Sequence, residues 1–220
     1  YLHIAGAKSG VYVYLNGQEV GYNEDSKNPA EFLINKYIKN GKNTLVLKIF
    51  RWSTGSYLEC QDFWRLSGIE RDVFLYSQPK IAVKDFRVVS TLDDSYTNGI
   101  FKLAVDIRNN AATDKNLQVL YELIDKASGK VVANATESCI VKGEDIQTVT
   151  FGANLPRVKT WTSEGPNLYK MLISLKEEDK VTEIVPFNVG FRRIEIKQIG
   201  QIAKNGKPYV VLMINGQPLK

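Results

Sequence analysis

Seven segments of strand-like composition follow one another at short, even intervals between residues 81 and 189. In one of them, Ile100–Ile107, apolar residues alternate with Lys102, Ala104 and Asp106, which is the period-two pattern of a half-buried antiparallel strand. Turn signals separate the runs, for example Asn98-Gly99 and Ser128-Gly129. Seven short strands over about 110 residues predict an immunoglobulin-like β-sandwich. The chain has no Cys–Trp–Cys pattern, so the expected sandwich lacks a disulfide. The seven segments are Ile81–Ser90, Ile100–Ile107, Leu117–Ile124, Val131–Ser138, Ile146–Phe151, Leu168–Leu175 and Thr182–Val189.

A second β-rich region precedes Pro79, which suits a linker or a strand edge because proline cannot donate to a ladder. Val11–Leu15 is β-branched and aromatic, and the Asn16-Gly17 pair that follows it favours a type I′ hairpin. Leu45–Phe50 is another strand candidate. Glu31–Tyr37 is the one helical candidate and is expected to form a short turn. After residue 191 the chain reads as short hairpin pieces.

Composition excludes several classes of function. The net charge of +5 comes from scattered Lys and Arg residues, whereas nucleic-acid binding requires a concentrated basic patch. No apolar run approaches the roughly 20 residues of a membrane span. His3 is the only histidine and lies in an apolar run, which argues against a self-contained zinc site or a Ser-His-Asp triad. Cys60 and Cys139 are expected to be free thiols, with a single long-range disulfide as the alternative.

The segment 57–73, YLECQDFWRLSGIERDV, is the densest in groups that bind ligands. Sugar sites combine aromatic faces with carboxylates that accept hydroxyl hydrogen bonds and coordinate cations. The residues alone favour a structural interpretation, with Phe63 and Trp64 in the core and Asp62 paired with Arg65. Glu59 and Asp62 are two carboxylates, but a retaining glycosidase needs them about 5 Å apart, and closeness in sequence does not set that distance.

Several motifs in this order resemble bacterial β-galactosidases of glycoside hydrolase family 2. Residues 62–69, DFWRLSGI, match the pattern Asp-Met-Trp-Arg-x-Ser-Gly-Ile with Phe63 in place of Met. The resemblance covers most of the chain and also includes residues 17–32 (GQEVGYNEDSKNPAEF), 51–53 (RWS), 161–169 (WTSEGPNLY), 189–192 (VGFR) and 205–208 (NGKP).

The resemblance implies an all-β chain with a partial jelly-roll β-sandwich followed by an immunoglobulin-like β-sandwich. Residues 1–79 would be the C-terminal part of a sugar-binding jelly-roll domain, and residues 80–191 the immunoglobulin-like domain. Residues 192–220 would lead into a TIM-barrel catalytic domain outside this chain. The second Asn-Gly-x-Pro turn, at residues 215–218, has no counterpart in that lead-in.

The resemblance also implies one substrate contact. Asp62 matches the aspartate that touches galactose and helps to ligate a sodium ion, while Trp64, Arg65, Ser67 and Gly68 would support its loop. Cys60 stands where the family usually has an acid. The acid/base Glu, the nucleophile Glu and the His and Glu ligands of magnesium would lie in the barrel, so no catalytic residue is expected here.

We therefore expect a non-catalytic piece of a retaining β-galactosidase that hydrolyses terminal β-D-galactosides. The chain begins at Tyr1 without Met, which fits an excised piece of a longer protein. That parent would need magnesium and sodium, form a homo-oligomer and act in a bacterial cytoplasm or periplasm, with no cofactor bound by the piece alone. The alternatives are a stand-alone carbohydrate-binding or structural module, and a piece of a β-glucuronidase or β-mannosidase, which share this domain order.

Overall fold

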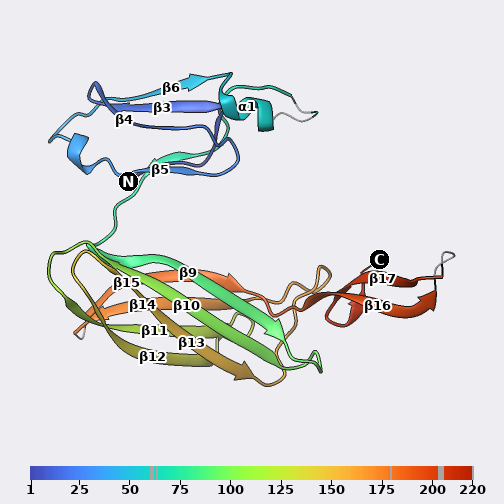
Figure 1. The fold of residues 1–220 in the computed structure, drawn as a ribbon. Helices are drawn as coiled ribbons and strands as arrows, with labels where there is room; N and C mark the ends of the chain where they lie inside the picture. The colour runs from blue at the N-terminus through green and yellow to red at the C-terminus, as the bar shows by residue number, and fades with distance from the viewer. Residues whose placement is uncertain (60–61, 63, 179, 203–205, 220) are drawn as a thin grey trace. The chain divides into compact units, whose positions relative to one another are not determined.

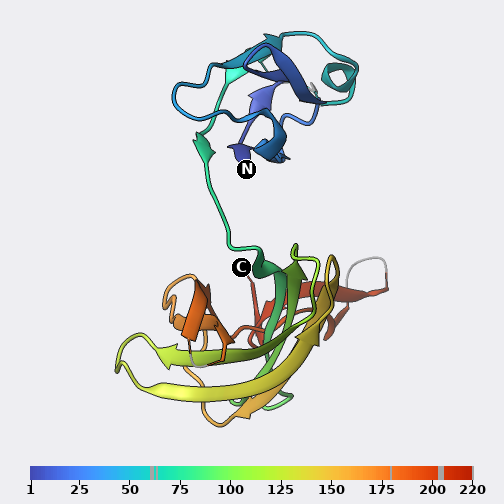
Figure 2. The same cartoon turned by 90° about the vertical axis from the view of Figure 1, so that its left-hand side faces the viewer.

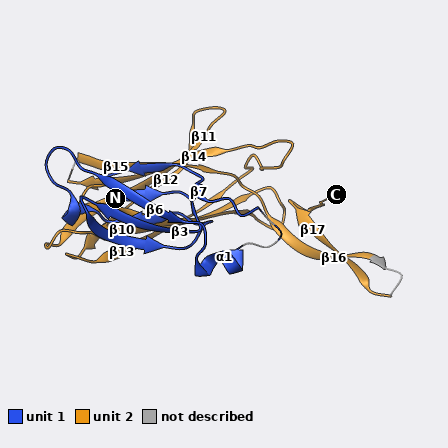
Figure 3. Ribbon diagram, turned by 90° about the horizontal axis from the view of Figure 1, so that it is seen from above, with its two compact units in different colours: residues 1–77 blue, residues 78–220 orange. Residues whose placement is uncertain are grey.

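The computed structural model describes residues 1–59, 62, 64–178, 180–202 and 206–219, with no account of the side chains of residues 201 and 202. The chain divides into two compact units, Tyr1–Ser77 and Gln78–Lys220, which are coloured separately in Figure 3. Strands dominate both units (Figure 1), which confirms the all-β expectation. No helix in the described residues is long and apolar enough to cross a membrane. Cys60 and Phe63 lie outside the described residues.

The first unit consists of short strands in three small sheets. Two of these sheets, with strand orders β5-β1-β8 and β4-β3-β6, share a core that includes Leu2, Ile4, Val11, Val13 and Leu15. The third sheet pairs β2 with β7. The elements are β1 (Leu2–Ile4), β2 (Ala7–Lys8), β3 (Gly10–Leu15), β4 (Gln18–Asn23), β5 (Ala30–Phe32), η1 (Asn35–Tyr37), β6 (Leu45–Phe50), α1 (Thr54–Glu59), β7 (Gly68–Ile69) and β8 (Val73–Leu75).

Of two local predictions for this unit, the hairpin turn at Asn16-Gly17 is confirmed and the helical turn at Glu31–Tyr37 is partly wrong. Asn16 and Gly17 have φ values of 53° and 81°, which are the left-handed angles of a type I′ hairpin, and they join β3 to β4. The helical prediction for Glu31–Tyr37 is wrong for its first residues, because Glu31 pairs with His3 in the β1–β5 ladder. Only Asn35–Tyr37 forms a single 3₁₀ turn.

The second unit contains the seven-stranded sandwich predicted from the sequence (Figures 1 and 2). One sheet has the order β13-β10-β9 and the other β12-β11-β14-β15, and every ladder is antiparallel. Six of the predicted segments fall within one of these strands, and the seventh, Leu168–Leu175, begins one residue before its strand. The strands are β9 (Ile81–Leu92), β10 (Gly99–Asn109), β11 (Lys115–Asp125), β12 (Val131–Val141), β13 (Ile146–Leu155), β14 (Tyr169–Glu177) and β15 (Lys180–Val189).

The core of the second unit lies between the two sheets. Phe101, Leu103, Val105 and Ile107, the apolar half of the β10 alternation, are at most 1% exposed. The ring of Phe101 lies 5.2 Å from that of Tyr121 on β11, measured between centroids. Because burial of apolar surface is worth roughly 25 cal/mol per Å², these facing side chains are the main source of stability of the sandwich.

A hairpin follows the sandwich and contains the second Asn-Gly-x-Pro segment of the sequence, residues 215–218. It consists of β16 (Ile194–Ile202), β17 (Pro208–Ile214) and β18 (Gln217–Pro218). The turn between β17 and β18 has φ values of 49° at Asn215 and 78° at Gly216. A Cβ on Gly216 would lie 2.7 Å from the ring of Tyr96, which belongs to the β9–β10 turn. The second turn therefore packs the hairpin against the sandwich, which gives it a structural role.

Candidate functional site

Asp62 projects from the segment that follows α1, in the first unit. Its side chain is exposed, and its φ of 48° is left-handed. Asp tolerates this conformation better than most residues other than Gly. Among the described residues, no hydrogen bond or ion pair engages the Asp62 carboxylate. Within the described part of the chain, the Asp62 carboxylate is therefore exposed and unpaired.

The residues after Asp62 are held by three hydrogen bonds that involve main-chain carbonyl groups. Lys8 Nζ donates to the carbonyl oxygen of Trp64 at 3.2 Å. Arg51 Nε donates to the carbonyl oxygen of Arg65 at 3.2 Å, and Ser67 Oγ donates to that of Lys8 at 3.2 Å. The lysine is 4% exposed, so the first of these bonds fixes the loop from within the unit.

Gly68 closes the loop by pairing with Lys8 in the β2–β7 ladder. Its φ of 133° is a conformation that L side chains rarely adopt, although a Cβ there would meet no atom within 4 Å. Glycine is therefore required by the backbone angle and not by space.

Two arginines stack on an exposed tryptophan beside this loop. The guanidinium carbon of Arg65 lies 4.9 Å from the ring centroid of Trp52, and that of Arg51 lies 5.7 Å from it. Such cation–π contacts are worth about 0.5–1 kcal/mol at exposed sites. Trp64 is 76% exposed, so the structural interpretation that placed its ring in the core is wrong. Arg65 interacts with Trp52 and not with Asp62.

A network of carboxylates anchors α1, and nothing in the sequence indicated it. Glu24 accepts hydrogen bonds from the Tyr22 hydroxyl at 2.5 Å and from the Gly55 amide at 2.7 Å. These two bonds, the one from Tyr22 foremost, lower the pKa of Glu24. Burial and then the bond to Glu24 raise the pKa of Tyr22 to about 12. Glu24 and Gly55 are 31 positions apart, so only the fold reveals the contact.

Glu59, the other carboxylate that the sequence pointed to, makes a hydrogen bond within the first unit. Its Oε1 accepts a hydrogen bond from the Ser26 amide at 3.2 Å. Its Oε2 and the Ser26 hydroxyl are buried, and neither has a partner among the described residues. Glu59 therefore serves as an anchor of α1, and the structure gives it no role opposite Asp62 as an acid and nucleophile pair.

The described residues do not form a cation site by themselves. No group of three or more His, Cys, Asp or Glu side chains within them could hold a metal ion. Hard cations take several oxygen ligands, and Asp62 supplies one carboxylate. If sodium binds at Asp62, most of its ligands must come from elsewhere.

The motifs of residues 161–169 and 189–192 meet at the end of the sandwich. The Trp161 amide donates to the carbonyl oxygen of Phe191 at 2.8 Å, and the Arg192 guanidinium carbon lies 4.6 Å from the Trp161 ring centroid. A Cβ on Gly190 would lie 3.1 Å from Trp161. Phe191 is fully buried, and its ring meets that of Tyr169 edge to face at 5.3 Å. The contacts between these two motifs therefore hold the end of the sandwich together, which is a structural role.

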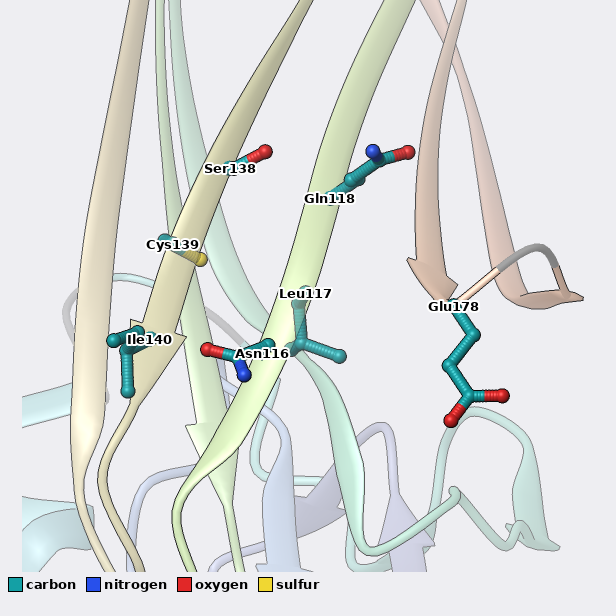
Figure 4. A pocket seen from close by; sticks show the side chains of 7 residues that line it. All are labelled: Asn116, Leu117, Gln118, Ser138, Cys139, Ile140 and Glu178. Atoms are coloured by element: carbon teal, nitrogen blue, oxygen red, sulfur yellow. The ribbon is translucent and has the colours of Figure 1, made fainter.

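A surface depression of about 410 Å³ lies over β11, β12 and Glu178 in the second unit (Figure 4). Among the described residues, its lining has no aromatic ring and one acid, which is a poor match for a sugar site. Cys139, which is a free thiol, contributes to the lining. Burial raises the pKa of Cys139, and because the thiolate is the reactive form, it is a poor nucleophile. The seven lining residues are Asn116, Leu117, Gln118, Ser138, Cys139, Ile140 and Glu178.

Family models match nearly the whole chain. Residues 1–79 match the model described as "Glycosyl hydrolases family 2, sugar binding domain", and residues 81–192 match "Glycosyl hydrolases family 2". A β-galactosidase from Priestia megaterium is 39% identical over 98% of this chain, and one from Kluyveromyces lactis is 35% identical over 97%. The alignments cover 21% and 22% of those two proteins, so the chain spans about a fifth of their length.

Solved structures share the fold at low identity. A β-glucuronidase from Bacteroides uniformis superposes with a TM-score of 0.85 at 17% identity, covering all of this chain and 26% of that one. A putative β-galactosidase from Bacteroides fragilis gives a TM-score of 0.81 at 19% identity over 99% of this chain and 32% of its own. The matches to both family models, with the order of motifs and the shared fold, show that the chain belongs to glycoside hydrolase family 2.

Proposed function

We propose that the chain is part of a β-galactosidase that hydrolyses terminal β-D-galactosides with retention at the anomeric carbon. The observation that carries this proposal is the 39% identity to a β-galactosidase along 98% of the chain. The β-glucuronidase structures are only 17–20% identical, and they support the fold without favouring a glucuronide substrate. The residues that break the glycosidic bond lie outside this chain in this proposal.

In the proposed enzyme, Asp62 accepts a hydrogen bond from a galactose hydroxyl and supplies one oxygen ligand to sodium. Its exposed carboxylate and its anchored, left-handed backbone support this role. The loop is held at Trp64, Arg65 and Ser67 through hydrogen bonds that do not involve Asp62. The Asp62 carboxylate is therefore available to bind a ligand. Magnesium binding in the barrel and assembly into a homo-oligomer belong to the same proposal.

The test compares Asp62→Asn with Asp72→Asn in the full-length enzyme, since Asp72 is an exposed acid of the same unit. A hydrogen bond to a charged group is worth about 1.5–3 kcal/mol, so Asp62→Asn should lower kcat/KM for an aryl β-galactoside by roughly 10- to 100-fold. It should also weaken the dependence on sodium, while Asp72→Asn should leave both unchanged. Unaltered kinetics and sodium dependence in Asp62→Asn would assign Asp62 a purely structural role.

Two further measurements separate the alternatives. The full-length enzyme should prefer an aryl β-galactoside over the matching β-glucuronide and β-mannoside, and the opposite preference would overturn the substrate assignment. The 220-residue chain alone should show no turnover. If calorimetric titration of this chain with galactose or lactose gave binding tighter than millimolar, a stand-alone carbohydrate-binding module would become the better description.

A further inference from the structure

Asn-Gly pairs occur five times in the chain, at residues 16, 40, 98, 205 and 215. In an Asn-Gly pair, the glycine amide nitrogen can attack the side-chain carbonyl carbon of the asparagine, since glycine has no side chain to hinder the approach. All five pairs share this intrinsic chemistry. The structure describes four of them, and differences in their reactivity must come from their surroundings.

Asn16 is held by three hydrogen bonds at its side-chain amide. Its Nδ2 donates to the carbonyl oxygen of Tyr37 at 2.9 Å and to Asn43 Oδ1 at 2.8 Å. Its Oδ1 accepts a hydrogen bond from the Thr44 amide at 3.0 Å. Rotation of this amide toward the Gly17 nitrogen would break all three bonds.

Asn98 is held in a similar way and is also enclosed. Its Nδ2 donates to Asp93 at 2.8 Å, and its Oδ1 accepts from the Arg157 amide at 3.1 Å. Gly99 is buried, and a Cβ there would lie 2.8 Å from the Phe191 ring. The backbone has no room to swing into the geometry of attack.

Asn215 is anchored from two sides. Its Oδ1 accepts a hydrogen bond from the Arg193 amide at 2.9 Å, and its Nδ2 donates to the carbonyl oxygen of Trp161 at 3.0 Å. Gly216 lies against the Tyr96 ring. This pair is therefore protected by bonds and by packing.

Asn40 differs from these three asparagines in its exposure and in the hydrogen bonding of its side chain. Asn40 and Gly41 are both exposed, in the loop between η1 and β6. Within the described part of the chain, the Asn40 side chain makes no hydrogen bond, and the Gly41 amide donates none. Gly41 has a φ of 83°, and a Cβ there would meet no atom within 4 Å. Among the described residues, no hydrogen bond of the Asn40 side chain or of the Gly41 amide has to break before the Gly41 nitrogen approaches the Asn40 side chain.

We infer that, of the four described Asn-Gly pairs, Asn40-Gly41 is the one at which the folded chain modifies itself by deamidation. The Gly41 nitrogen bonds to Asn40 Cγ and loses its proton, while the Cγ–Nδ2 bond breaks and ammonia leaves with that proton. Water then opens the resulting five-membered imide at either carbonyl carbon. The products are aspartate and isoaspartate at position 40, and each adds one negative charge to a chain of net charge +5.

The modification would act on a loop that Asn43 organises. Asn43 Oδ1 accepts a hydrogen bond from the Lys39 amide at 3.0 Å, and its Nδ2 donates to the carbonyl oxygens of Lys39 and Gly41 at 2.8 and 2.9 Å. Isoaspartate at position 40 inserts a methylene group into the main chain between the carbonyl groups of Lys39 and Gly41. The same Asn43 contacts Asn16 of the β3–β4 turn, so the change would reach a turn beside the core of the first unit.

The experiment follows all five pairs in one sample of the 220-residue chain, incubated at 37 °C and mildly alkaline pH. Cleavage after glutamate places Asn16, Asn40 and Asn98 in separate peptides, residues 1–19, 32–59 and 71–122. Mass spectrometry then measures the gain of one mass unit, and fragmentation distinguishes isoaspartate. Because two or three protecting hydrogen bonds must break first at each of the other asparagines, Asn40 should react at least about fivefold faster than Asn16, Asn98 or Asn215.

Two controls make the result decisive. In guanidinium the four described pairs should deamidate at similar rates, because they share the same intrinsic chemistry. In the folded chain, Asn40→Gln should abolish the modification of peptide 32–59. Equal rates at Asn40 and at any of the other three described pairs in the folded chain would overturn the inference. So would an Asn40 that stays intact in the folded chain while it reacts in guanidinium.

Discussion

Gly99→Ala should destabilise the second unit because the added methyl group has no space. Gly99 is the first residue of β10, and its Cβ would lie 2.8 Å from two ring atoms of Phe191 and 2.8 Å from a methyl group of Val158. Phe191 cannot retreat easily, since its ring is fully buried against Tyr169. Overpacking of this kind costs about 1–3 kcal/mol.

The net effect is smaller than the clash alone. Gly99 is not among the glycines with positive φ, so alanine can adopt its backbone angles. The alanine then gains about 0.4–1 kcal/mol by restricting the unfolded chain. The expected loss in the free energy of unfolding is therefore between about 0 and about 2.6 kcal/mol, and Gly99→Ala should be about 1–3 kcal/mol less stable than a glycine-to-alanine variant that meets no clash.

Gly152→Ala is the matched control. Gly152 lies on β13, which pairs with β10, and the nearest atom to its Cβ is a carbonyl oxygen of Phe101 at 3.8 Å. Alanine there meets no clash and restricts the unfolded chain in the same way, so the variant should be neutral or stabilised by up to about 1 kcal/mol.

The assay is urea unfolding followed by tryptophan fluorescence. Trp161 is the only tryptophan of the second unit, and the other two, Trp52 and Trp64, are exposed in the first. With both of these replaced by Phe, the signal reports only the unit that contains Gly99. A Gly99→Ala variant as stable as the Gly152→Ala variant would refute the steric argument.

Three further predictions follow from the hydrogen bonds and backbone angles. Hydrogen bonds from Ser95 and Asn98 lower the pKa of Asp93 to about 2, below its ordinary value near 3.9. The ionised Asp93 carboxylate therefore stabilises the fold above about pH 4, and this stabilisation is lost as the pH falls toward 2. Asp93→Asn should therefore lower the Tm at pH 7, and the difference from the unmodified chain should shrink by pH 2. Gly68→Ala should cost about 1–3 kcal/mol of local strain, seen as faster amide exchange in residues 64–69. Glu24→Gln should lower the pKa of Tyr22 from about 12, measured by ultraviolet titration, and an unchanged value would show that Glu24 does not contribute to it.

The strands of the sandwich could be predicted because their signal is local. In β10 the alternation of apolar and polar residues follows from one inward face and one outward face, and Phe101 and Leu103 lie in the core as that pattern requires. The Asn16-Gly17 turn could also be predicted from the sequence, since few residue pairs tolerate two left-handed φ angles.

The surroundings of the candidate site could not be predicted in the same way. Helix α1 contains Gly55 and is six residues long, so it has too little periodicity to be detected. Its anchors come from distant positions, Glu24 to Gly55 and Ser26 to Glu59. The position of Trp64 depends on the bond from Lys8 to its carbonyl oxygen, and no pattern in the sequence distinguishes an exposed tryptophan from a buried one.

Asp62 can be tested cleanly because its side chain contributes nothing to the described structure. The carboxylate is exposed and unpaired within the described residues, and substitutions at such positions usually change stability by no more than about 0.5 kcal/mol. Asparagine also tolerates the left-handed φ of 48° that Asp62 adopts. Asp62→Asn therefore removes the charge and leaves the loop anchored at Trp64, Arg65 and Ser67. Any loss of activity in that variant must then come from the missing charge, and it would identify Asp62 as a contact of substrate or cation.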